Sequence, residues 1–257
     1  MACAMSKANP SDQQLTGEPG QEKKLNTPSN WARAIAETLE ESGVDVPSVF
    51  AHIGMDYDRL YEQDSYYLQD QITQLWNAAA EMSHNPYFGL KAGVRIQSTS
   101  YPTVGYALMA SKNFKASCQR MVRYQDILAE GFHLKLEENS GDYGLTFDIL
   151  TCELPPSVQA VDAMFSSFLS FIAWLTQKNV VPIKATLKRT QPENTQIFDD
   201  IFQCPIEYNS SKNCLHFSEA HMQYALPTAD EGLAAIHDAS ACRLLEKSVK
   251  GSITSHV

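Results

Sequence analysis

Histidines and paired carboxylates are the side chains of this sequence that most often carry acid–base or metal chemistry. The seven histidines are dispersed, and no two have the HxxxH or HExxH spacing that places metal ligands on one helix face. Adjacent carboxylates occur at Glu40-Glu41 and Glu137-Glu138, both in a polar, solvated context. An enzyme needs a nucleophile, a base and an orienting group, or a set of metal ligands. We therefore expect no catalytic site, no metal and no cofactor.

A second group of side chains suits the binding of a small molecule. Segment 104–111 places the hydroxyls of Tyr106 and Ser111 beside Leu108 and Met109. A mostly apolar pocket with a few convergent polar groups is the usual small-molecule site. The segment therefore predicts a pocket wall, with ordinary hydrophobic core as the equal alternative.

Arg123 and Tyr124 lie among apolar residues of a predicted helix. An arginine on or near an apolar face needs a partner, because an unpaired buried charge is costly. That partner is either an internal carboxylate, such as Asp126 or Asp162, or the carboxylate of a ligand held by two hydrogen bonds. Both residues are therefore candidate ligand-binding residues.

The elements that would position these residues are mainly helices. Apolar residues at helical spacing predict helices over 31–42, 69–83, 114–130 and 157–178. Aromatic residues that include Phe168 and Trp174 surround nearly the whole circumference of the last of these. Such a helix is either a core helix or the wall of a lipophilic cavity, so we include both residues among the candidate ligand contacts.

Strands are predicted in pairs. Alternation over 133–138 and 145–150, with a turn signal at 139–142, predicts one hairpin, and 206–208 with 214–217 predicts a second. A further strand with one exposed face is expected over 183–188. The pattern indicates an α+β fold that is mostly helical, with a small antiparallel sheet built from hairpins.

The last predicted helix is the candidate element for subunit pairing. A capping box at 228–231 opens it, and it extends to Lys250. Its apolar residues Leu233, Ile236 and Leu244 are candidate contacts in a homodimer. The alternative is that this face packs on its own domain.

Composition limits the class of partner. The 257 residues carry a net charge of −10, and an acidic surface repels the phosphates that nucleic-acid-binding proteins engage with Lys and Arg. Residues 1–28 lack an export signal and read as a disordered tail. The most apolar stretch, 164–175, is too short to cross a bilayer, and we expect a cytoplasmic protein without membrane contact. Its six cysteines are then reduced, mostly buried thiols.

An ordered series of short motifs resembles the N-terminal effector domain of AraC/XylS-type bacterial transcription regulators. It covers about residues 31–235 in unbroken order. The matching pieces are the Gly-hydrophobic-Asp repeat at 43 and 54, Leu75-Trp76, 85–93, 105–111, Arg123-Tyr124, 202–206 and 226–230.

The resemblance implies a ligand-sensing domain that binds a small organic effector (an organic acid, a fatty acid or an amino-acid metabolite) and controls a C-terminal DNA-binding domain with two helix-turn-helix motifs. Residues 29–250 are then the effector-binding and dimerisation domain, and 251–257 are similar to the lead-in to the DNA-binding domain. We expect that this domain is missing from the chain, so that DNA is contacted only through the absent part.

Two alternatives remain open within this interpretation. The domain is a ligand-independent dimerisation module of the same class of regulator, or it is a thiol or haem sensor that uses Cys118 or His133. The activity of a dimerisation module would be set by its abundance or by a protein partner, and an enzyme of unrecognised type is the last alternative.

Overall fold

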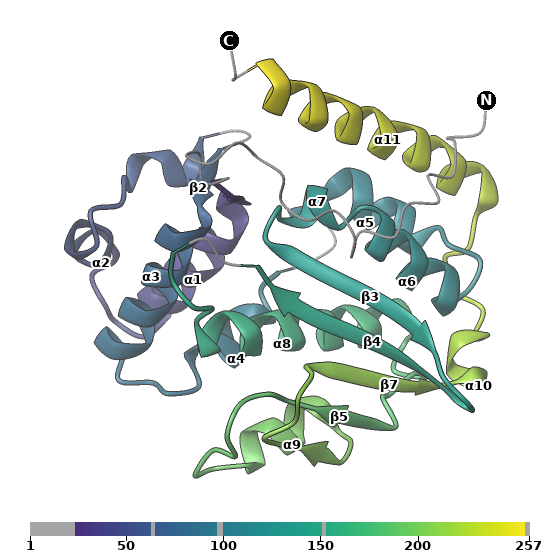
Figure 1. Ribbon diagram of the computed structural model, residues 1–257. Coiled ribbons are helices and arrows are strands. Elements are labelled where there is room, and N and C mark those ends of the chain that lie inside the picture. Colours follow the sequence, from purple (N-terminus) through teal and green to yellow (C-terminus); the bar gives the residue numbers. More distant parts are fainter. Residues whose placement is uncertain (1–23, 63–64, 97–99, 151–152, 255–257) are drawn as a thin grey trace.

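The computed structural model describes residues 24–62, 65–96, 100–150 and 153–254, and Figure 1 shows their arrangement. The fold is α+β and mostly helical, as the sequence pattern predicts. The helices of the first part of the chain lie beside a sheet, and the last helix, α11 (Glu231–Thr254), crosses the top of the molecule in Figure 1.

The first part of the chain is helical because its apolar residues recur at helical spacing. α1 (Ser29–Glu41) buries Trp31, Ile35 and Leu39 on one face, and Gly43 follows it with a φ of +74°, the left-handed conformation predicted for its end. α2 (Val46–His52), the 3₁₀ helix η2 (Asp58–Tyr61), α3 (Gln69–Met82) and α4 (Phe88–Gly93) follow.

Two short strands join this part of the fold. β1 (Asn26–Pro28) pairs antiparallel with β2 (Tyr66–Leu68), so residues 26–28, which we assigned to the N-terminal tail, belong to the fold. The rest of the predicted tail, residues 1–23, lies outside the described residues.

The middle of the chain forms three helices, α5 (Pro102–Met109), α6 (Phe114–Arg123) and α7 (Gln125–Leu128). The prediction of one continuous helix over 114–130 is wrong. The break falls at Tyr124, whose ring is fully buried and whose hydroxyl donates to Asp238 at 2.9 Å. A tertiary contact at the junction thus takes precedence over local helical propensity.

Among the described residues, five strands form one sheet in the order β3-β4-β7-β5-β6. The first predicted hairpin is confirmed: β3 (Phe132–Glu138) pairs antiparallel with β4 (Asp142–Ile149), with Leu134 opposite Phe147. The other strands are β5 (Lys184–Thr186), β6 (Ile206–Glu207) and β7 (Cys214–Ser218).

The second predicted hairpin is wrong. β5 lies between β6 and β7, and β6 pairs with β5 in parallel. The intervening segment is held by Asn213, whose side-chain Oδ1 accepts from the Lys188 amide and whose carbonyl accepts from the Phe147 amide. These bonds direct β7 to β4 and β5, so the larger sheet is mixed.

α8 (Val158–Leu175) is the central core helix. Gly93 of α4 allows its close approach, because a Cβ at Gly93 would overlap the Ala163 carbonyl and the Ser166 hydroxyl. Among the described residues, α8 is the one helix whose length and hydropathy would suffice to cross a membrane, and 56% of it is buried inside the protein. That burial is expected of a core helix.

The C-terminal part contains α9 (Gln196–Phe202), α10 (Glu219–Met222) and α11. The cap of α11 differs from the predicted capping box: Asp230 Oδ1 accepts from the Leu233 amide at 2.9 Å, while the Thr228 hydroxyl donates to the Met109 carbonyl. α11 continues to Thr254, so four of the seven residues predicted as linker are helical, and residues 255–257 lie outside the described residues.

Candidate functional site

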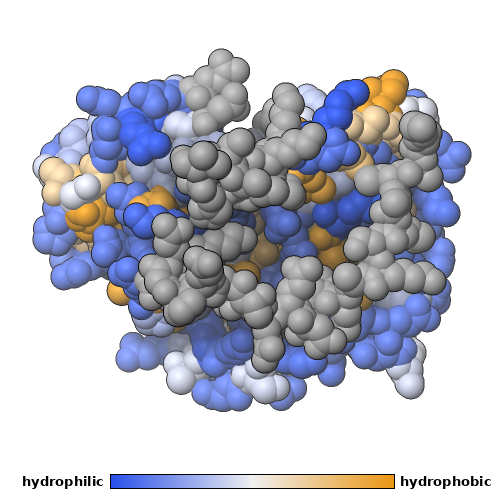
Figure 2. All heavy atoms as spheres, turned by 45° about the horizontal axis from the view of Figure 1, so that its top comes forward, coloured by the Kyte–Doolittle hydropathy of each residue, from blue (hydrophilic) through white to orange (hydrophobic). Residues whose placement is uncertain are grey.

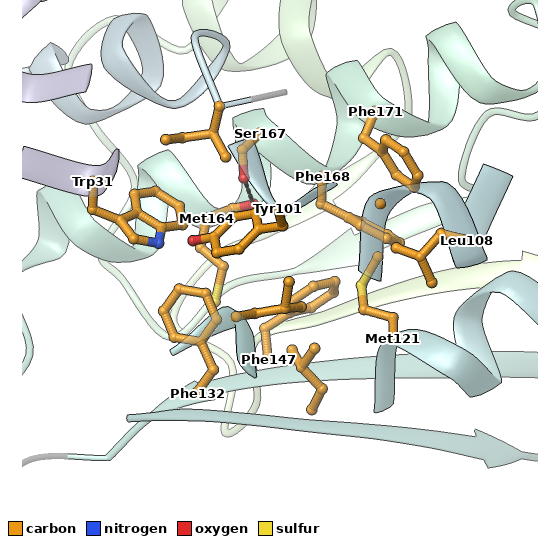
Figure 3. Close-up of a pocket in the computed structure, with 14 residues that line it drawn as sticks. Trp31, Tyr101, Leu108, Met121, Phe132, Phe147, Met164, Ser167, Phe168 and Phe171 are labelled. Atoms are coloured by element: carbon orange, nitrogen blue, oxygen red, sulfur yellow. Dashed lines mark hydrogen bonds between the residues drawn. The ribbon is translucent and has the colours of Figure 1, made fainter. Parts of the chain in front are cut away.

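An apolar pocket of about 90 Å³ lies between the helices and the sheet (Figure 3). Its helical walls come from α5, α6 and α8 and include Leu108, Met121, Met164, Ser167, Phe168 and Phe171. The sheet supplies Phe132, Leu134 and Phe147, and Trp31 of α1 and Tyr101 stand at one end.

Simple periodicities place these walls. On α8, Met164, Ser167, Phe168 and Phe171 recur at spacings of three and four residues, so they share the face that borders the pocket. On the sheet, Leu134 and Phe147 are directly paired and therefore project to the same side. The aromatic contacts are tight, with the Phe147 and Phe168 ring centroids 5.1 Å apart.

The polar groups of the pocket are few and lie mostly at the end formed by Trp31 and Tyr101. The Trp31 side chain is buried, and its indole Nε1 makes no well-formed hydrogen bond within the described part of the chain, although the Tyr101 hydroxyl lies beside it. The Tyr101 hydroxyl points toward it in Figure 3 and donates to Asn30 Oδ1 across a long 3.4 Å. Burial raises the pKa of Tyr101 well above its ordinary value, so the group remains a neutral donor. The Ser167 hydroxyl donates to the Met164 carbonyl at 2.9 Å.

Of the six predicted ligand-binding residues, Phe168 lines this pocket. Tyr106 is 43% exposed and lies against the His237 ring on α11, with centroids 5.4 Å apart. Trp174 is 55% exposed, and Arg123 is exposed with its guanidinium over the Tyr124 ring. These three residues therefore face away from the pocket interior.

The remaining two, Ser111 and Tyr124, are buried in a polar cluster that connects α6 to α11. Its centre is an ion pair in which Arg120 Nε and Nη2 donate to the Asp238 carboxylate at 2.9 to 3.1 Å. The Tyr124 hydroxyl donates to Asp238, and Ser111 Oγ accepts from Arg120 Nη1 at 3.0 Å. Burial and the nearby Asp238 both raise the pKa of Tyr124.

The internal ion pair expected for Arg123 is thus made by Arg120, one turn earlier. Asp162, considered as a partner of Arg123, pairs instead with Arg189. Sequence reasoning missed Arg120 and Asp238, although a signal existed: Asp238 lies midway between Ala234 and Ala241, which are the buried positions of α11. Trp31, Tyr101, Phe132 and Phe147 were missed as pocket residues because their proximity is purely tertiary.

The three residues predicted for a dimer interface lie on the outer face of α11. Leu233, Ile236 and Leu244 are 50%, 61% and 40% exposed, while Ala234 and Ala241 face the domain. The surface drawn in Figure 2 is mainly hydrophilic, and its hydrophobic residues form small separate patches. Because Leu233, Ile236 and Leu244 are exposed, they do not pack on their own domain, which was the alternative.

The thiol-sensor alternative finds no support in the geometry. Cys118 is fully buried, and this burial raises the pKa of its thiol far above the ordinary value. Because the thiolate is the reactive form, this burial disfavours a sensing role for Cys118. His133, the other residue of this alternative, is half-buried on β3 opposite Asp148.

Comparison with known proteins gives a consistent result. Residues 43–226 match the family described as the arabinose-binding domain of AraC transcription regulators, N-terminal. The ornithine utilization regulator of Pseudomonas aeruginosa is 19% identical over 207 residues, which are 79% of this chain and 60% of that protein.

A solved structure has the same fold. The crystal structure of the transcriptional regulator CdpR from Pseudomonas aeruginosa superimposes with a TM-score of 0.60 at 12% identity, over 80% of this chain and 60% of that one. The chain therefore spans about 60% of the length of either relative.

Proposed function

Because this chain belongs to the family of arabinose-binding N-terminal domains of AraC transcription regulators, we propose that it senses a small organic effector and thereby controls a C-terminal DNA-binding domain. The observation that carries the proposal is the apolar pocket enclosed by α1, α5, α6, α8 and the sheet. Most small-molecule sites are concave, mostly apolar and equipped with a few polar groups, as this one is.

The effector is a small organic molecule of the kind that such regulators sense. An organic acid, a fatty acid and an amino-acid metabolite are the classes that the family resemblance brings forward. The name of one relative, ornithine utilization regulator, makes ornithine a probe worth including.

Transmission to the DNA-binding part runs through α11. α6 contributes Met121 to the pocket wall, and the preceding residue, Arg120, holds Asp238 on α11. An effector shifts the balance between two arrangements only by binding one of them more tightly. A ligand that displaces α6 would therefore change the position of α11. This domain is acidic and repels DNA phosphates, so we expect the C-terminal domain to make the contacts with DNA.

Pairing of two copies is the second part of the proposal. Leu233, Ile236 and Leu244 offer an apolar face on α11, and a homodimer formed there would bring two DNA-binding domains together. The protein then works in the bacterial cytoplasm, as a regulator without enzymatic activity.

Thermal unfolding of the 257-residue chain with a panel of small metabolites tests the proposal. A ligand at 100 times its Kd stabilises the folded state by about 2.7 kcal/mol. Ser167→Phe fills the pocket and should abolish the shift, whereas Ser170→Phe, on the same helix outside the pocket lining, should retain it. A shift that survives Ser167→Phe would place the ligand elsewhere.

One observation favours a ligand-independent dimerisation domain as the second candidate. The cavity is smaller than the roughly 150 Å³ that holds a benzene ring in an engineered apolar cavity. This candidate predicts that no ligand changes the melting temperature and that dimerisation through α11 is constitutive. Sedimentation at increasing protein concentration, with and without the metabolite panel, separates the two.

A further inference from the structure

The end of the pocket at Trp31 presents two hydrogen-bond donors. Trp31 is 4% exposed, and its indole N–H makes no well-formed hydrogen bond among the described residues; the acceptor that it faces is the Tyr101 hydroxyl oxygen. The Tyr101 hydroxyl faces it in Figure 3 and has a long 3.4 Å bond to Asn30. A buried donor with only a poorly formed hydrogen bond is unfavourable, so a ligand oxygen that accepts there with good geometry gains affinity.

The rest of the lining carries no charge. Among the described residues, its other side chains are aromatic or aliphatic, apart from Ser167 and Gly105, and none of those described is Asp, Glu, Lys, Arg or His. An ionised carboxylate or ammonium group would lose its hydration there without meeting a counter-charge. The lining thus disfavours organic anions and amino-acid zwitterions.

The walls can adapt to a ligand larger than the present cavity of about 90 Å³. Met121 and Met164 lie on opposite helices, and methionine side chains are unbranched and change rotamer easily. Filling an apolar void also recovers the dispersion contacts that its lining lacks. The pocket therefore favours an apolar body over a polar one.

We propose that the effector is an uncharged, largely apolar molecule with one carbonyl oxygen (an ester, ketone or aldehyde) that accepts a hydrogen bond from the Trp31 indole N–H and a second from the Tyr101 hydroxyl, which exchanges its long bond to Asn30 for the ligand. This inference rests on the proposed function, since it names the ligand class of the same pocket. It replaces the acid, fatty-acid and amino-acid classes that the family resemblance brings forward with an uncharged class.

Methyl octanoate and octanoate make a matched pair of probes, because they share the chain and the carbonyl and differ in charge. Calorimetric titration of the 257-residue chain at neutral pH should show methyl octanoate binding at least tenfold more tightly than octanoate. Trp31→Phe keeps an aromatic ring, removes the N–H, and should weaken methyl octanoate binding about fivefold, the effect of one hydrogen bond. Trp174→Phe, at an exposed position outside the pocket, is the control and should change nothing.

The outcomes separate the inference from the proposed function. Octanoate binding as tightly as methyl octanoate, with both abolished by Ser167→Phe, overturns the ligand class and leaves effector sensing intact. Unchanged affinity in Trp31→Phe overturns the assigned hydrogen bond, and Tyr101→Phe serves as the second variant if Trp31→Phe does not fold. If methyl octanoate, octanoate and the neutral fluorophore N-phenyl-1-naphthylamine all fail to bind, the assigned ligand class is overturned, whereas effector sensing is decided by the metabolite panel.

Discussion

Arg120 on α6 and Asp238 on α11 form an ion pair with two N–H donors on one carboxylate, at 2.9 to 3.1 Å. The two side chains are only about one-fifth exposed. This ion pair joins residues that are 118 positions apart in the chain. It holds α11 against α6, one of the helices that border the pocket. Together with the packing of α5 on α11, it links the pocket wall to the last helix.

Loss of Asp238 should destabilise the domain. In Asp238→Ala the Arg120 guanidinium and the Tyr124 hydroxyl lose their acceptor, and we expect the free energy of unfolding to fall by about 2 kcal/mol. Urea denaturation measures this. Glu246→Ala, on the exposed face of the same helix, is the control and should stay within about 0.5 kcal/mol of the parent.

Phe168 is the predicted ligand residue that borders the pocket, and its truncation should enlarge the cavity. Phe168→Ala is expected to cost about 3–5 kcal/mol, because packing and dispersion contacts are lost. The enlarged cavity should then bind benzene, which would raise the melting temperature of the variant more than that of the parent. Trp174→Ala removes a comparable aromatic ring at an exposed position, and a similar loss of stability there would contradict the assigned burial.

Local sequence patterns predicted individual helices and strands better than they predicted which strands pair in the sheet. The helical spacing of Trp31, Ile35 and Leu39 correctly predicted α1, and Gly43 marked its end. Alternating apolar residues correctly predicted the β3–β4 hairpin and its turn. Both depend on interactions within a few residues. The β6–β7 hairpin was wrong because β5, some twenty residues earlier than β6, enters between them, and no local signal specifies such an insertion.

The site was predicted less well than the fold, for the same reason. Arg123 and Arg120 are one turn apart on one helix, and only the position of Asp238 on α11 decides which of them is paired. Tyr106 and Ser111 carry suitable hydroxyls, but the rotation of α5 directs Tyr106 to His237 and buries Ser111 beside Arg120. The orientation of a helix in the fold is set by its neighbours, not by its own residues.

Asp162 should make stability depend on pH in an unusual direction. Burial raises its pKa from 3.8 to about 6, although the nearby Arg189 lowers it. The native state then holds a proton that the unfolded chain has released, so this group's contribution to stability is largest below pH 4 and falls as the pH rises to about 6.

Urea denaturation at pH 4, 5 and 6 tests this sign. Relative to Asp162→Asn, which does not titrate, the parent protein should lose stability over that interval. A gain would mean that the pairing with Arg189 outweighs burial.

The outer face of α11 should mediate association of two chains. Ile236 is 61% exposed, and a glutamate there would place a charge in the proposed apolar contact formed with Leu233 and Leu244. We expect Ile236→Glu to shift the chain to monomer in sedimentation velocity, with an unchanged melting temperature for the monomer, since the residue makes few contacts within its own domain. Ala235→Glu adds an acidic residue at an exposed position of the same helix that lies about 100° or more around the helix axis from the three apolar residues, and it should leave association largely intact. A parent chain that sediments as a monomer at every concentration would overturn the role of α11 in association.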